Sequence, residues 1–141
     1  MFVSCSDARV VPALLTGSRP GDLYELRTYG GVVPQYEAGE STGESRTIER
    51  AVRELEITDI VICGHSDCGV VDKAVKATEE HSGTSTAGHW HTVAQLDALC
   101  GYPSIMRRLT ARSLRLHAWF YEIETGAVLQ YGPGARSFRP L

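Results

Sequence analysis

The stretch Asp59-Ile60-Val61-Ile62-Cys63-Gly64-His65-Ser66-Asp67-Cys68-Gly69 decides the fold class. Its first half is almost entirely apolar, and such a run is typical of a strand in a parallel sheet that is covered on both faces. Its second half places an imidazole and a thiol three residues apart, where that strand ends. Polar groups at the carboxyl ends of parallel strands form the functional edge of such sheets, so we expect a site at His65 and Cys68.

A second polar motif, Cys5-Ser6-Asp7-Ala8-Arg9, follows the short apolar pair Phe2-Val3 at the start of the chain. Neighbouring parallel strands release their loops at the same edge, so residues distant in sequence can meet there. Two thiolates, an imidazole and a carboxylate are donors of a tetrahedral zinc site. For a single cysteine an ordinary buried thiol is the simpler interpretation. Taken together, the residues predict a Zn2+ site with four candidate ligands: Cys5, Asp7, His65 and Cys68.

The spacing of Cys5, Asp7 and Arg9 leaves two states of this site open. On an extended backbone the three side chains share one face, so Asp7 can reach either the metal or Arg9. If Asp7 binds the metal, the site is closed. If Arg9 holds Asp7 as a bidentate partner, one metal position stays open for water, as in catalytic zinc sites. In that state Asp7 and Arg9 are the candidate catalytic residues.

The rest of the chain alternates helical and strand patterns. Strands are expected over residues 2–4, 23–27 and 59–64, followed by a hairpin of 114–123 and 127–131. Helices are expected over 11–16, 45–55, 68–80, 91–99 and 104–109. We expect 81–88 to be a mobile loop and Trp90 to have a packing role, and the tail Gly132-Pro133-Gly134 has no ordering signal of its own. This pattern predicts an α/β fold: a mostly parallel sheet flanked by helices, with a terminal antiparallel edge strand.

Composition restricts the possible partners. The chain has 141 residues, 14 basic and 17 acidic, with a net charge of −3, which does not favour nucleic acid as a partner. No apolar run approaches the roughly 20 residues of a membrane span, and no secretory signal segment is visible. The expected location is therefore the cytoplasm, where thiols stay reduced.

Both metal motifs, together with Pro20-Gly21-Asp22-Leu23, Arg27-Thr28-Tyr29-Gly30-Gly31 and 116–126, resemble the β-class carbonic anhydrases in type and order. The resemblance implies a zinc lyase that hydrates carbon dioxide reversibly to bicarbonate by zinc-bound hydroxide, with Cys5, His65 and Cys68 as permanent ligands. It also implies a homodimer or higher homo-oligomer. Two alternatives remain: hydrolysis of carbonyl sulfide or carbon disulfide on the same site, and a catalytically silent zinc-binding homologue.

The chain departs from the family pattern in two respects. The family's Arg-Asn-x-x-Asn reads Arg27-Thr28-Tyr29-Gly30-Gly31, so two amides are missing near the expected rim of the site. Residues 1–141 are expected to form a single domain that lacks the family's usual N-terminal helices and has a shortened helical insert. Those helices wrap a partner subunit in the family, so the dimer is the property that this difference affects. Candidates for a proton shuttle are His81, His89 and His91, although the simpler interpretation is that they are surface residues.

Overall fold

The computed structural model describes the backbone of residues 1–78 and 84–141, and the side chains of 1–73 and 86–141. A six-stranded sheet with the order β2-β1-β3-β4-β5-β6 forms its centre. The strands are β1 (Phe2–Cys5), β2 (Glu25–Thr28), β3 (Asp59–His65), β4 (Arg115–Tyr121), β5 (Val128–Gly132) and β6 (Ser137–Pro140). The helices are α1 (Pro12–Thr16), the short 3-10 helix η1 (Tyr29–Gly31), α2 (Gly43–Arg53), α3 (Gly69–Thr78), α4 (Thr84–Cys100) and α5 (Pro103–Thr110).

The strands β2, β1, β3 and β4 are parallel, and β5 and β6 continue the sheet in antiparallel order. β1 lies between β2 and β3, with Ser4 opposite both Arg27 and Cys63. The carboxyl ends of β1 and β3 therefore lie side by side at one edge of the sheet. The expected α/β class, with a mostly parallel sheet and a terminal antiparallel strand, is confirmed.

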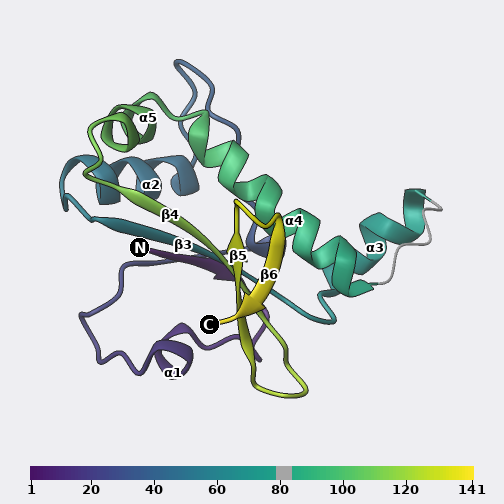
Figure 1. The fold of residues 1–141 in the computed structure, drawn as a ribbon. Coiled ribbons are helices and arrows are strands. Elements are labelled where there is room, and N and C mark those ends of the chain that lie inside the picture. Colours follow the sequence, from purple (N-terminus) through teal and green to yellow (C-terminus); the bar gives the residue numbers. More distant parts are fainter. Residues whose placement is uncertain (79–83) are drawn as a thin grey trace.

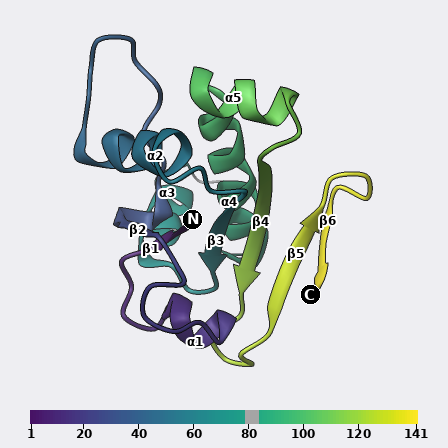
Figure 2. The same ribbon diagram turned by 90° about the vertical axis from the view of Figure 1, so that its left-hand side faces the viewer.

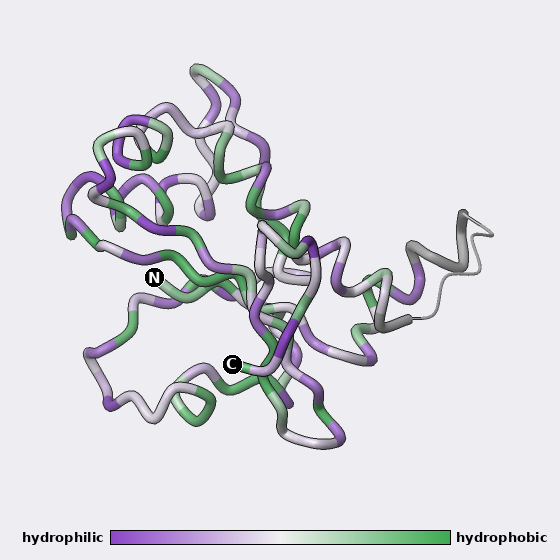
Figure 3. The backbone as a smooth tube through the Cα atoms, viewed as in Figure 1, coloured by the Kyte–Doolittle hydropathy of each residue, from purple (hydrophilic) through white to green (hydrophobic). Residues whose placement is uncertain are grey.

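The hydrophobic core lies between one face of the sheet and helices α2, α4 and α5, which Figures 1 and 2 show gathered on that side. Ile60 and Ile62 of β3 are almost completely buried, and so are Ile48 of α2 and Leu99 of α4. The apolar stretches of the tube in Figure 3 run along these central strands. Helix α1 lies on the other side, where Pro12 begins it and Gly17 ends it in the left-handed conformation at φ 65°.

Helix α4 lies unusually close to the ends of β3 and β4. A Cβ added at Gly64 would lie 1.9 Å from the Thr92 Oγ1, and one added at Gly88 would lie 2.8 Å from the Phe120 ring. Glycine at both positions therefore allows the helix to contact the strands directly. This close packing fixes α4 against the residue that precedes His65.

Two expectations about α4 are wrong. The helix begins at Thr84, so residues 84–88 are helical rather than a loop. Its buried side also includes Thr92 and Gln95, and because both are polar, the hydrophobic pattern of the sequence did not identify them as buried. These polar groups are satisfied internally, because Thr92 donates to Gly88 O at 2.7 Å and Gln95 Oε1 accepts from Val33 N at 2.9 Å. Trp90 is 68% exposed and does not pack in the core.

The C-terminal residues also form a strand that was not predicted from the sequence. Residues 137–140 form β6, which pairs with β5 through Tyr131 opposite Phe138, so β6 and not β5 is the edge strand. The aromatic rings of this pair lie 5.4 Å apart. Aromatic cross-strand contacts stabilise such a hairpin even where the sequence around the turn, with Pro133 and Gly134, carries no strand pattern.

Candidate metal centre

Three of the four predicted ligands converge at the carboxyl edge of the sheet. Cys5 ends β1, His65 ends β3, and Cys68 directly precedes α3. Their ligand atoms lie within 4.8 Å of one another, and all three residues are buried. Among the described residues this is the one group of His, Cys and acidic side chains close enough to hold an ion, so His65, His89 and His91 form no second site there.

The orientation of His65 fits a metal ligand. Its Nδ1 lies 2.8 Å from Ser66 O, and because a carbonyl only accepts, Nδ1 carries the proton. Nε2 is then left with its lone pair. It is buried and has no hydrogen-bond partner among the described residues. A buried unpartnered nitrogen is costly, and a cation shared with two thiolates would satisfy it. Both donor chemistry and orientation therefore fit a zinc ion.

Asp7 lies beside this group but is held by Arg9. The Arg9 Nε donates to Asp7 Oδ1 at 3.0 Å and its Nη2 to Oδ2 at 2.8 Å, while the Arg9 backbone N–H also donates to Oδ1 at 2.9 Å. These hydrogen bonds hold the pKa of the Asp7 carboxyl well below its usual range. Of the two states that the sequence left open, the structure has Asp7 paired with Arg9.

Arg9 is itself anchored to the second metal motif. Its Nη2 also donates to Asp67 O at 3.0 Å, on the turn between His65 and Cys68. The residue Asp67 adopts a positive φ of 53°, a conformation that Asp tolerates better than most residues. One guanidinium thus links the loop after β1 to the loop after β3.

A hollow of about 310 Å³ opens over the group, and two of its lining residues, Val70 and Lys73, were not predicted from the sequence. Tyr29, Val70 and Lys73 line it together with Cys5 and Asp7. Val70 and Lys73 follow Cys68 in α3 by two and five positions, so the helix that starts at the ligand also supplies the wall. Tyr29 is 68% exposed at the rim.

Gly31, which stands where the family pattern has its second asparagine, lies in a turn with an unusual backbone conformation. Gly30 and Gly31 both adopt φ 69°, in the left-handed region. A Cβ added at Gly31 would lie 3.3 Å from the backbone N of Cys5, so glycine suits both the positive φ and this close approach. A Cβ at Gly30 would lie 2.7 Å from Val70 Cγ1, which explains why glycine is needed there.

None of the predicted shuttle histidines in the described part of the chain lines the hollow. His89 stacks on Phe138 with ring centroids 4.3 Å apart, and burial lowers its pKa. His91 places Nε2 2.8 Å from Gly30 O, where it braces the turn beside the site. His81 lies outside the described residues.

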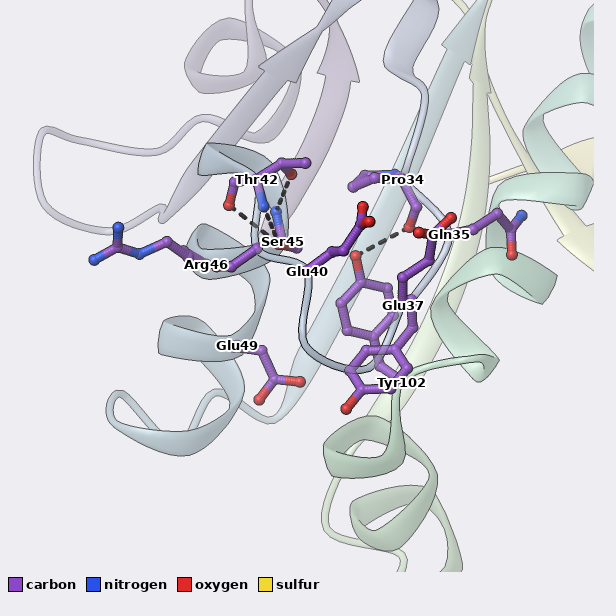
Figure 4. A pocket seen from close by; sticks show the side chains of 11 residues that line it. Pro34, Gln35, Glu37, Glu40, Thr42, Ser45, Arg46, Glu49 and Tyr102 are labelled. Carbon is purple, nitrogen blue, oxygen red and sulfur yellow. Dashed lines mark hydrogen bonds between the residues drawn. The ribbon is translucent and has the colours of Figure 1, made fainter.

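A second hollow of about 300 Å³ lies at the start of α2 (Figure 4). Glu37, Glu40 and Glu49 line it together with Tyr102, whose hydroxyl donates to Pro34 O at 3.0 Å. Burial and nearby carboxylates raise the pKa of Tyr102 to about 12, so the phenol stays neutral. This hollow shares no residue with the metal group.

Comparison with known proteins identifies the family. The family model described as carbonic anhydrase matches residues 1–94. The carbonic anhydrase of Pseudomonas aeruginosa is 33% identical, over 100% of this chain and 76% of that protein. Carbonic anhydrase 1 of Escherichia coli O157:H7 is 34% identical, over 100% of this chain and 77% of that protein.

Solved structures agree. The β-carbonic anhydrase CcaA superposes with a TM-score of 0.88 at 33% identity, over 99% of this chain and 76% of that one. A tetrameric β-carbonic anhydrase of Sordaria macrospora superposes with a TM-score of 0.78 at 22% identity, over 93% of this chain and 79% of that one. The chain belongs to the β-carbonic anhydrase family of enzymes. Within the described ranges no helix is both long and apolar enough to cross a membrane.

Proposed function

We propose that this chain catalyses the reversible hydration of carbon dioxide to bicarbonate, with Zn2+ held by Cys5, His65 and Cys68. The observation that carries the proposal is the convergence of these three buried ligand atoms beside a carboxylate that is held by Arg9. Cys5, His65 and Cys68 would supply three of the four ligands of a tetrahedral zinc site, and the Asp7–Arg9 pair would leave the fourth position to water. Family membership supports the same reaction.

A zinc ion in this position would make hydroxide available near neutral pH, because such an ion lowers the pKa of water to about 7. The chain supplies the remaining functions. Asp7 stays ionised, since its pKa is held low, and it can therefore only accept a hydrogen bond. We assign it to accept from the attacking oxygen and so to orient that oxygen toward carbon dioxide. Arg9 fixes the carboxylate through two parallel hydrogen bonds, a task for which a lysine is poorly suited.

We extend the proposal to the domain organisation, the oligomeric state and the location of the chain. Residues 1–141 form one domain in our interpretation, and the domain acts as a homo-oligomer, which the tetrameric Sordaria relatives support by analogy. A reducing compartment such as the cytoplasm suits a site whose ligands are thiolates.

The test combines metal analysis with stopped-flow measurement of carbon dioxide hydration by the zinc-loaded chain. We expect about one zinc per chain and a rate that falls with loss of the metal. A fully loaded preparation that is inert toward carbon dioxide would contradict the proposal. Release of sulfide from carbonyl sulfide or carbon disulfide, measured on the same preparation, would then identify a sulfur analogue as the substrate.

A further inference from the structure

Arg27, at the edge of the sheet, reaches across the end of β1 into the loop that carries the site. It lies on β2 opposite Ser4. Its Nη2 donates to Asp7 O at 2.7 Å, to Val10 O at 2.8 Å and to Cys5 O at 3.2 Å, and its Nε donates to Cys5 O at 3.3 Å. One guanidinium thus contacts three backbone carbonyls of the same short loop.

These three carbonyls belong to the segment from Cys5 to Val10, which carries both the proposed metal ligand and the Asp7–Arg9 pair. Cys5 and Asp7 belong to the proposed site, and Val10, which is fully buried, anchors the far end of the loop. The other backbone hydrogen bonds of the loop are Ser6 N to Thr28 O at 2.9 Å and Val10 N to Asp7 O at 3.1 Å, and Arg9 adds its bonds to the Asp7 side chain and to Asp67 O. Of all these contacts, only those of Arg27 join the carbonyls of Cys5, Asp7 and Val10 to one another. Three carbonyl dipoles that converge on one point repel one another, so the curve of the loop depends on a cation between them.

We propose that Arg27 is a positioning residue that sets the geometry of Cys5 and Asp7 through their backbone. This inference rests on the proposed function only for its effect on turnover, since its effect on metal binding is independent of the reaction. A guanidinium suits the task because it is planar, always charged, and presents donors in a fixed arrangement. Arg27 contacts the backbone of the site residues and not the reacting atoms, which separates its role from that of Arg9.

The experiment compares Arg27→Gln and Arg27→Lys with Arg19→Gln as the matched control. Arg19 lies in the same region of the chain, and its side chain is 87% exposed in a pair with Asp22, remote from the site. Three quantities are measured: the zinc dissociation constant by chelator competition, the absorption bands of the Co2+-substituted protein, and the pH profile of kcat/KM. The thermal midpoint is recorded for each variant.

We expect Arg27→Gln to weaken zinc binding and to lower kcat/KM, each by about 10- to 100-fold, as is typical when a residue that orients metal ligands is lost. The cobalt bands should shift, the lysine variant should be intermediate, and Arg19→Gln should match the wild type. A glutamine variant whose zinc affinity and cobalt bands stay within about twofold of the wild type, with only a lower thermal midpoint, would overturn the inference.

If Arg27→Gln does not fold, the lysine variant decides. A folded Arg27→Lys protein with weakened zinc binding supports the inference, and one with wild-type affinity and cobalt bands overturns it. If the wild-type protein itself is inert toward carbon dioxide, the proposed function fails. The zinc constant and the cobalt bands still report on Arg27 in that case.

Discussion

The guanidinium of Arg9 holds both carboxylate oxygens of Asp7, with Nε 3.0 Å from Oδ1 and Nη2 2.8 Å from Oδ2. The same guanidinium donates to Asp67 O, so the Asp7 side chain is oriented relative to both metal motifs at once. This relationship distinguishes a site with an open metal position from one that four protein ligands close.

Replacing Arg9 with alanine should reduce turnover while sparing the metal. The change removes both side-chain hydrogen bonds to Asp7, so the carboxylate loses its fixed orientation. We expect kcat/KM for carbon dioxide hydration to fall by about 10- to 100-fold, with zinc content unchanged by elemental analysis. Arg9→Lys should restore little, because one ammonium cannot reproduce the planar fork. Full activity in Arg9→Ala would show that the pair has no part in the reaction.

Loss of a ligand should remove metal and stability together. In Cys5→Ser, His65→Ala or Cys68→Ser, zinc content should drop and the thermal midpoint should fall, because binding free energy to a preformed site contributes to folding free energy. Cys100→Ser is the control, since that thiol is exposed and outside the site. If a ligand variant retained stoichiometric zinc, that residue would not be a ligand.

Because Gly64, directly before His65, packs closely against α4, any larger side chain at this position should destabilise the fold. In Gly64→Ala the new methyl group would meet Thr92 Oγ1 at 1.9 Å and force α4 away from β3. We expect a loss of about 1–3 kcal/mol in the free energy of unfolding, as is usual for overpacking. Chemical denaturation measures it, and Thr92→Ala in the same chain should recover part of the loss. An unchanged free energy of unfolding in Gly64→Ala would mean that α4 is not held as closely as the structure has it.

The ion pair between Asp59 and Arg115, which lies outside the candidate metal site, should make the stability of the fold depend on pH in acid. Arg115 donates to both Asp59 oxygens, at 2.7 and 2.8 Å, and these bonds keep the pKa of Asp59 well below its usual range. A depressed carboxyl pKa contributes stability that is fully present above the unfolded value of about 3.9 and is lost as the pH falls below it.

Thermal unfolding of the wild type and Arg115→Ala across this range tests the prediction. The difference between their midpoints should be largest at neutral pH and should shrink below about pH 4. A difference that stays constant in acid would assign the stabilisation to something other than the ionised pair.

The parts of the fold that could be predicted are those in which local pattern and tertiary environment agree. The apolar run Ile60–Ile62 forms the buried central strand, and Ile48, Ala51 and Val52 form the inner face of α2. Prediction failed where tertiary contacts override pattern. Helix α4 buries Gln95 because Val33 N in the loop over it donates to the side chain, and it buries Thr92 because that hydroxyl donates to Gly88 O of the same helix. Strand β6 exists because β5 offers an edge to pair with.

The candidate site divides in the same way. The convergence of Cys5, His65 and Cys68 could be predicted because both motifs stand at strand ends, where parallel neighbours must meet. The contacts of Arg27 could not, because its partners are backbone carbonyls, which leave no signature in side-chain type. Gly31 looked like a lost amide in the sequence, whereas the structure shows a positive φ there and a Cβ that would lie 3.3 Å from the Cys5 backbone N.

Parallel pairing of β1 with β3 has a consequence for biosynthesis. A ribosome that has delivered only the first motif has made a chain with one of the three buried donors, because His65 is the sixtieth residue after Cys5 and Cys68 follows it. Capture of the ion must therefore follow synthesis of the central strand. In our proposal, a cut between the two motifs would therefore place the metal ligands on two separate fragments.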